Sequence, residues 1–173
     1  EVRVEGDIDA FADPAVREMD LIVPCITRAA IGKEPLDNLL AAVQGGVGIA
    51  GYHGGLAGSF REAVGFHFMA GCQWVAHPGG IIPFRVEVTR PDDPVMDGIG
   101  DFDYRSEQYF LHVDPAVEVL ATTTFSGEHA PWIDGVTMPV VYKKHYGAGR
   151  VFYTALGHVV REFEHPQMRE ILD

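Results

Sequence analysis

The sequence has few of the features that mark specialised classes of protein. Its 173 residues include two cysteines, Cys25 and Cys72, which lie far apart and form no CxxC pair. Two buried free thiols are therefore expected rather than a disulfide framework, although Cys25 ends an apolar segment, and strand ends are where active sites lie in open α/β sheets. No apolar run approaches the roughly 20 residues of a membrane-spanning helix, and no basic leader precedes an apolar stretch. We expect a cytoplasmic protein with no membrane partner.

Positive charge is also scarce. The 13 Lys and Arg residues stand against 25 Asp and Glu, the net charge is −12, and the basic residues are scattered along the chain. Such a chain repels phosphate backbones, so nucleic acid and anionic membrane are not expected as partners. Hydrophobic residues make up 47% of the chain and charged residues 22%. This composition suits one globular domain over residues 1–173 with a sizeable core.

What the sequence does contain is an alternation of apolar runs and amphipathic segments, the pattern of βαβ units. It predicts strands at 2–4, 21–24, 47–52, 84–88, 109–113, 117–124, 140–144 and 151–155, and helices at 34–44 and 56–69. Helical turns are expected at 14–19 and 94–99, and a short helix from residue 166. The loop at 146–149 is expected to join the strands at 140–144 and 151–155 as a hairpin-like pair. This order predicts a doubly wound, mostly parallel sheet with helices on both faces. Such folds usually open with a buried strand and a helix before a strand like 2–4, so we expect an N-terminally incomplete fragment.

The most informative segment follows the buried strand at 47–52. Its sequence Gly51-Tyr52-His53-Gly54-Gly55 has the layout of a nucleophile elbow, in which small neighbours let one side chain stand on a tight strand-to-helix turn. The side chain displayed is that of His53. At a helix N-terminus the macrodipole disfavours positive charge, so the imidazole is expected to be neutral and available as a base, a hydrogen-bond donor or a metal ligand. The alternative is that His53 only caps a glycine-rich turn.

Four motifs occur in an order that resembles the ThuA-like family of trehalose utilisation. They are Gly51-Tyr52-His53-Gly54-Gly55, His77-Pro78-Gly79-Gly80, Ser106-Glu107-Gln108-Tyr109 and Gly157-His158. The resemblance extends over residues 38–158 and implies a flavodoxin-like sheet related to class I glutamine amidotransferases. It also implies a role in the metabolism of trehalose and related disaccharides, through 3-keto glycosides and beside a sugar dehydrogenase partner.

The same resemblance indicates which residues carry chemistry. Glutaminases of the group have cysteine at the elbow, whereas this chain has His53, so thiolate attack on an amide is not expected. His158 matches the position of the histidine that follows a late strand. Glu107 precedes an apolar strand, and spacing alone favours an ordinary loop acid; the resemblance makes it a candidate for the cleft. Together the three residues form a two-histidine, one-carboxylate set, which suits zinc or another divalent ion.

Further candidates concern substrate binding. Gly54 and Gly55 of the elbow, His77 of the histidine-proline turn and Tyr109 are expected to contact a small-molecule sugar, and Trp74 and Trp132 offer faces for stacking. We expect an enzyme that acts on trehalose-type disaccharides or their 3-keto derivatives, with the two histidines and the glutamate in acid/base or metal-binding roles. The alternative is a non-catalytic sugar-binding or accessory module. The sequence does not decide the oligomeric state, and a homo-oligomer is one alternative.

Overall fold

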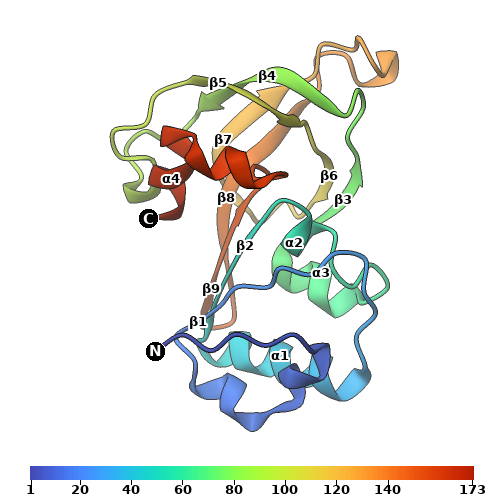
Figure 1. Ribbon diagram of the computed structural model, residues 1–173, viewed down its shortest axis with the longest axis vertical. Coiled ribbons are helices and arrows are strands. Elements are labelled where there is room, and N and C mark those ends of the chain that lie inside the picture. The colour runs from blue at the N-terminus through green and yellow to red at the C-terminus, as the bar shows by residue number, and fades with distance from the viewer.

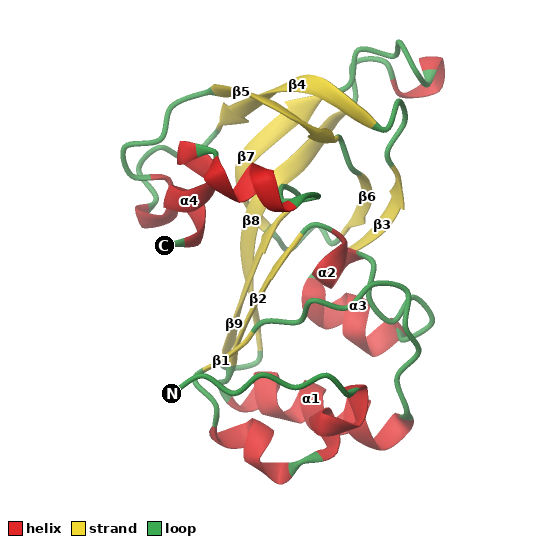
Figure 2. Cartoon of the chain, in the orientation of Figure 1, coloured by secondary structure: helices red, strands yellow, loops and turns green.

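The computed structural model describes residues 1–173 as an α/β protein built on one large curled sheet (Figures 1 and 2). The seven strands run in the order β1-β2-β9-β8-β7-β4-β5. Their bounds are β1 (Leu21–Ile22), β2 (Gly48–Tyr52), β4 (Ile81–Val88), β5 (Phe102–Glu107), β7 (Glu118–Thr124), β8 (Thr137–Tyr146) and β9 (Gly149–Thr154). A separate antiparallel pair is formed by β3 (Cys72–Ala76) and β6 (Phe110–Val113).

The helices are short. The α-helices are α1 (Lys33–Gly45), α2 (Gly54–Ala57), α3 (Val64–Ala70) and α4 (Pro166–Leu172). Turns of 3-10 helix are η1 (Ile8–Ala12), η2 (Pro14–Glu18), η3 (Pro94–Met96), η4 (Pro131–Ile133) and η5 (Val160–Glu164). None of them combines the length and the apolar character that crossing a bilayer requires.

The direction of the strands differs from the prediction. Only the β1–β2 and β2–β9 pairs are parallel, while β9–β8, β8–β7, β7–β4 and β4–β5 are antiparallel. The expected mostly parallel, doubly wound sheet is therefore wrong, and the sheet is mixed and mostly antiparallel. The reason lies in the connections: a parallel pair needs a crossover of a dozen or more residues, and α1 supplies one between β1 and β2. The tight turn at Gly147, by contrast, reverses the chain between β8 and β9.

Several predicted elements are confirmed, and two are wrong. The helix at 34–44, the turn at 14–19 and the helix from 166 appear as α1, η2 and α4. The strand at 2–4 does not form, and Val2 and Val4 are exposed. The helix at 56–69 is broken into α2 and α3 because Phe60 has a φ of +43°, a left-handed conformation that an α-helix does not tolerate. The strands β3 and β5 were not predicted.

Two hydrophobic cores cover opposite faces of the sheet. The first packs α1 and α3 against the central strands, through residues such as Leu39, Phe66 and Tyr153. The second packs η3 and α4 against β4 and β7, through residues such as Met96 and Met168. Figure 1 shows α2 and α3 on one side of β2 and β9, with α4 on the other. Helices on both faces were predicted, and this part of the architecture is confirmed.

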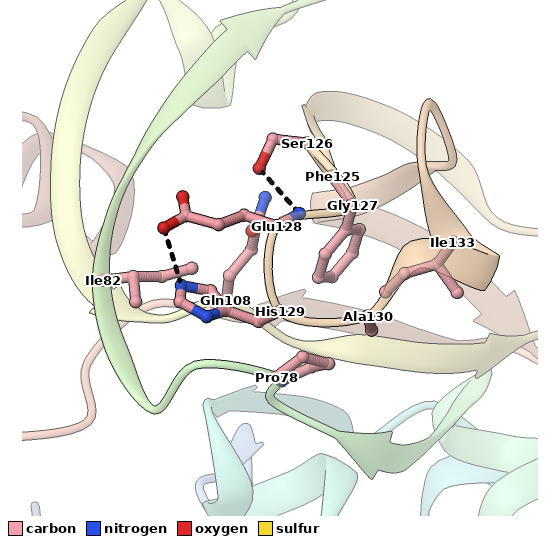
Figure 3. Close-up of a pocket in the computed structure, with 10 residues that line it drawn as sticks. All are labelled: Pro78, Ile82, Gln108, Phe125, Ser126, Gly127, Glu128, His129, Ala130 and Ile133. Atoms are coloured by element: carbon pink, nitrogen blue, oxygen red, sulfur yellow. Dashed lines mark hydrogen bonds and ion pairs between the residues drawn. The ribbon is translucent and has the colours of Figure 1, made fainter.

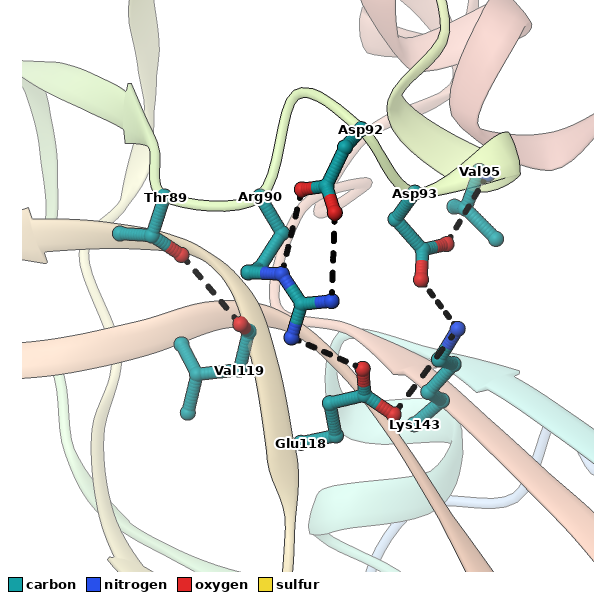
Figure 4. A network of polar contacts seen from close by, with 8 residues as sticks. All are labelled: Thr89, Arg90, Asp92, Asp93, Val95, Glu118, Val119 and Lys143. Atoms are coloured by element: carbon teal, nitrogen blue, oxygen red, sulfur yellow. Dashed lines mark hydrogen bonds and ion pairs between the residues drawn. The ribbon is translucent and has the colours of Figure 1, made fainter.

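A polar network fixes the loop at residues 89–93, which connects β4 to η3, against β7 and β8 (Figure 4). Arg90 contacts Asp92, and its Nη1 donates to Oε1 of Glu118 at 3.1 Å. Lys143 on β8 contacts both Asp93 and Glu118. None of these residues lines the cleft described below. The network therefore stabilises the curled end of the sheet rather than the site.

Candidate functional site

The elbow at the end of β2 has the geometry that the sequence indicates. His53 has a φ of +48° and a ψ of −136°, and α2 begins at the next residue. Its N–H donates to the Thr154 carbonyl at 2.7 Å, and its own carbonyl accepts a hydrogen bond from the Tyr153 hydroxyl at 3.1 Å. Both partners belong to β9, the parallel neighbour of β2. The neighbouring strand thus holds a backbone conformation that is rare for a residue other than glycine.

The glycines of the elbow are required by close packing. A Cβ on Gly51 would overlap the side chain of Leu56, which packs beneath the turn. A Cβ on Gly55 would lie 3.2 Å from the Pro24 carbonyl oxygen and 3.3 Å from Cα of Cys25. The loop after β1 therefore packs directly on the turn. The glycines of the motif thus allow the tight turn that places the side chain of His53 at the strand end.

The three candidates for chemistry converge in space. Glu107 is the last residue of β5, and His158 lies in the loop after β9. Glu107 Oε2 is 3.3 Å from Nε2 of His53 and 3.4 Å from Nδ1 of His158. One ligand atom from each of the three lies within 4.8 Å of the others. The expectation that residues separated by about fifty positions along the chain build one site is confirmed.

The imidazole of His53 is neutral at physiological pH. His53 is 8% exposed. Burial lowers the pKa of its imidazole to about 3, and the charges of His158 and His77 lower it further in the same direction. The expected cause was the helix macrodipole, but α2 has four residues and desolvation dominates. Nδ1 lies 3.0 Å from the Tyr109 hydroxyl, whereas the buried Nε2 has no hydrogen-bond partner. A buried nitrogen of this kind is normally satisfied by an ordered water or a bound ion.

His77 and Tyr109 flank the three residues. His77 Nε2 is 3.6 Å from Glu107 Oε1, and its Nδ1 is buried without a hydrogen-bond partner. The His77 ring stacks on Tyr109 with 6.2 Å between centroids, and it lies 5.5 Å from the ring of Trp74. Burial, and then the charge of Glu107, raises the pKa of the Tyr109 hydroxyl above its usual range, so this hydroxyl stays protonated.

These side chains line one cleft of about 360 Å³. It is also lined by Trp74, by Gly54 and Gly58 of the elbow turn, and by Thr27 and Arg28. The sequence analysis missed Thr27 and Arg28; the only available signal was their place just after a strand, beside Cys25. Trp132 is 83% exposed on η4 and does not line the cleft, so its role as a stacking face for the site is wrong.

A buried carboxylate behind the cleft joins its two halves. Glu162 is 5% exposed, and its Oε2 accepts hydrogen bonds from the His158 N–H at 2.8 Å and the Ser106 hydroxyl at 2.9 Å. The Tyr104 hydroxyl donates to the same oxygen at 3.3 Å. Because Ser106 precedes Glu107 in β5, Glu162 ties the strand that carries the site carboxylate to the loop that carries its second histidine. Sequence reasoning did not find this residue.

A second, much smaller hollow lies against the back of the same motifs (Figure 3). Its volume is about 10 Å³, and Pro78 and Gln108, the chain neighbours of His77 and Glu107, point into it together with His129. Such a space holds no more than about one water molecule. The hollow marks where the 125–133 loop packs on the His77 turn, and it is not a ligand site.

The residues present fit a divalent metal ion. Two ligand atoms bound tetrahedrally to one zinc ion lie about 3.3 Å apart, given metal–ligand distances near 2.0–2.1 Å. The two histidine-to-carboxylate distances, 3.3 and 3.4 Å, match this separation. The donor types, two imidazoles and one carboxylate, are those of metal sites that keep a coordination position open for substrate. The Tyr109 hydroxyl on Nδ1 of His53 is the kind of outer contact that orients such a ligand.

Comparisons with known proteins agree with this architecture. The family model described as ThuA, trehalose utilisation, matches residues 1–173. A ThuA-like protein of Bacteroides uniformis superposes with a TM-score of 0.78 and 19% identity, over 97% of this chain and 72% of that one. A cytoplasmic protein of Salmonella typhimurium gives 0.64 and 14%, over 98% and 74%. A β-galactosidase from Rahnella gives 0.59 and 17%, over 93% of this chain and 23% of that enzyme. No curated protein sequence matches the chain.

Proposed function

The chain belongs to the ThuA family of trehalose utilisation, and we propose that it is a metal-assisted enzyme acting on the 3-keto form of trehalose-type disaccharides. The observation that carries the proposal is the convergence of two imidazoles and one carboxylate on a cleft of ligand size, with both histidine-to-carboxylate distances close to the edge of a zinc tetrahedron. The proposed location is the cytoplasm, in keeping with the Salmonella relative. A sugar dehydrogenase is the proposed source of the keto substrate.

The three converging residues are assigned to metal binding. His53 offers Nε2, which is buried, makes no hydrogen bond and lies 3.3 Å from Oε2 of Glu107, and Glu107 and His158 complete the set. A divalent ion bound there would stabilise negative charge on a carbonyl oxygen of the substrate as a Lewis acid. Tyr109 orients the first histidine from its Nδ1 side, and Glu162 fixes the loop of the second through its backbone N–H. A nitrogen that binds a metal is not free to take a proton, so the base must be another group.

His77 is the group in the cleft that remains for proton transfer. Its imidazole lies between Trp74 and Tyr109, beside Glu107 but at 3.6 Å from it. In a 3-keto glycoside the C2 proton is acidic because it is next to the ketone. We assign its removal to His77; the electron pair then expels the glycosidic oxygen from C1, and the imidazolium returns the proton to that oxygen. The cleavage is redox-neutral and needs no further reactant.

The experiment measures metal content and turnover on the same samples. Purified protein is analysed by mass spectrometry for metals, and 3-keto trehalose is the substrate, with and without chelation. We expect one tightly held divalent ion per chain, loss of the ion in His53→Ala and Glu107→Gln, and its retention in His77→Ala, which should lose turnover. His145→Ala on β8, outside the cleft, is the matched control.

The outcomes separate the proposal from its rivals. A wild-type protein without a stoichiometric metal, or a His53→Ala variant that keeps both metal and turnover, would overturn the metal assignment. Binding of the keto sugar without turnover would instead favour a sugar-binding module of the same fold. Hydrolysis of glutamine by the wild-type protein would contradict the whole assignment, because the elbow residue is His53 and not a cysteine.

A further inference from the structure

We propose that the cleft carries a second subsite, centred on Arg28, that binds an anionic substituent of the sugar, either a carboxylate or a phosphate ester. This inference takes the sugar class of the ligand from the proposed function, but it concerns binding and does not depend on the proposed reaction. It rests on three observations: an unpaired guanidinium in the cleft, a strained backbone that places it there, and an aromatic surface that orients it.

The Arg28 guanidinium is not engaged by an acid. The chain has 25 acidic residues, and the guanidinium groups of Arg3, Arg85 and Arg90 each pair with a carboxylate. Arg28 makes no side-chain hydrogen bond or ion pair, and it lines the cleft. The other arginines without a partner lie outside the cleft; they are Arg105, Arg150 and Arg161. Arg28 is therefore the fixed cation that a ligand in the cleft can reach.

The backbone at Arg28 is held in a strained conformation. Its φ is +58°, and it is one of three residues other than glycine with a positive φ. Its N–H donates to the Gly58 carbonyl at 3.0 Å, and the Ser59 hydroxyl donates to the Ile26 carbonyl at 2.5 Å. The loop after β1 is thus clamped to the elbow turn on both sides of Thr27. Glycine would adopt this conformation without strain, so the presence of a long cationic side chain at such a position points to function.

Trp74 sets the direction of the guanidinium. Its ring lies 5.6 Å from the Arg28 guanidinium carbon and 5.5 Å from the His77 ring. The Arg28 guanidinium and the His77 imidazole thus share the Trp74 indole as a neighbour, which puts Arg28 within reach of a substituent on a sugar held beside His77. Cation–π contact with the indole stabilises the guanidinium. Arg61 also contacts the indole, at 5.0 Å, but does not line the cleft.

The cleft differs in charge from the protein as a whole, because its one arginine, Arg28, balances its one carboxylate, Glu107. The net charge is −12, so most of the surface repels anions. Within the cleft the single carboxylate, Glu107, is surrounded by the imidazoles of His53, His77 and His158. The charge left for a ligand is the positive one of Arg28. A planar guanidinium can donate two parallel hydrogen bonds to a carboxylate or a phosphate. We therefore expect the substituent to be one of these two groups.

The test uses metal-free protein, so that anions cannot bind to a metal ion. Glucose, glucuronate and glucose 6-phosphate are titrated by ligand-observed NMR and calorimetry at low and high salt. We expect at least one anionic sugar to bind about tenfold or more tightly than glucose, the equivalent of one charge-assisted contact, and the preference to weaken with salt. Which anion is preferred distinguishes the carboxylate from the phosphate source.

Three variants test whether the preference for anionic sugars depends on Arg28. Arg28→Gly should abolish it while leaving the melting temperature equal to or above that of wild type, because the strain at φ +58° is relieved. Arg61→Ala and Arg85→Ala remove the same charge outside the cleft and should keep it. Equal binding of the three sugars, no binding of any, or a preference that survives Arg28→Gly would each overturn the subsite. None of these results depends on metal retention or turnover, so the proposed reaction stands or falls separately.

Discussion

The buried imidazole of His53 makes the stability of the protein depend on pH. In the unfolded chain this imidazole takes up a proton as the pH falls through 6.5, whereas in the folded protein its pKa is lowered to about 3. Between these values the unfolded state binds more protons than the folded state. The contribution to the free energy of unfolding is therefore complete above 6.5 and is lost progressively as the pH falls toward 3.

The size of the effect follows from the same pKa values. At about pH 5 the group lies roughly 1.5 pH units below its unfolded pKa, and each unit is worth about 1.4 kcal/mol, so the loss is about 2 kcal/mol relative to neutral pH. The folded imidazole stays neutral at this pH, since its pKa is well below it. The loss then depends on the unfolded state alone.

The assay is urea unfolding followed by tryptophan fluorescence, in the presence of a chelator, at about pH 7.5 and about pH 5. The His53→Asn variant carries a neutral side chain that tolerates a positive φ. We expect the free energy of unfolding of the wild type to fall between the two conditions by about 2 kcal/mol more than that of the variant. His112→Asn, at an exposed position on β6, should behave as wild type. Identical pH dependence in wild type and His53→Asn would refute the reasoning.

Three further predictions concern packing. Gly51→Ala should lower the free energy of unfolding by about 1–3 kcal/mol because the added methyl overlaps Leu56. Gly100→Ala, at a position with open space, should leave it nearly unchanged. Equal losses in the two variants would contradict the steric argument. Glu162→Ala should cost about 3 kcal/mol or more in urea unfolding, since three donors lose their acceptor; a cost near zero would show that water replaces the carboxylate. Burial raises the pKa of Cys72 to about 12, so a disulfide reagent should label one thiol in the native protein and two after denaturation, and fast labelling of both would contradict this burial.

The elbow could be predicted because its signal is local. Gly51 and Gly55 are required by contacts within the turn and with the loop after β1, and the glycine spacing around His53 records those contacts in a short stretch of sequence. The same holds for α1, where apolar residues at helical spacing face the core and Gly46, with a φ of +128°, ends the helix. The position and exposure of a side chain on such elements follow from steric rules that act over a few residues.

Except for the β8–β9 hairpin, whose short loop is visible in the sequence, strand direction could not be predicted, and neither could the rest of the cleft, for the opposite reason. An apolar run such as β7 carries no mark that distinguishes a parallel from an antiparallel neighbour, and the sense of pairing is set by the length of the connection. Strand β5 alternates buried and exposed residues, but its polar sequence next to a turn-rich segment concealed it. Arg28 and Glu162 acquire their meaning only from partners on distant segments, Gly58 and Trp74 for the first and Ser106 and Tyr104 for the second.

The pairing of β2 with β9 has a consequence for how the protein is made. Residues Ile49 to Tyr52 have Val151 to Thr154 as their parallel partners. During synthesis β2 leaves the ribosome long before β9, so one edge of this apolar strand has no neighbour while most of the chain is still being translated. Contacts between such distant segments slow folding and prolong the exposure of aggregation-prone edges. We therefore expect nascent chains that end before Gly149 to be bound by chaperones, and release to coincide with the addition of the β8–β9 hairpin.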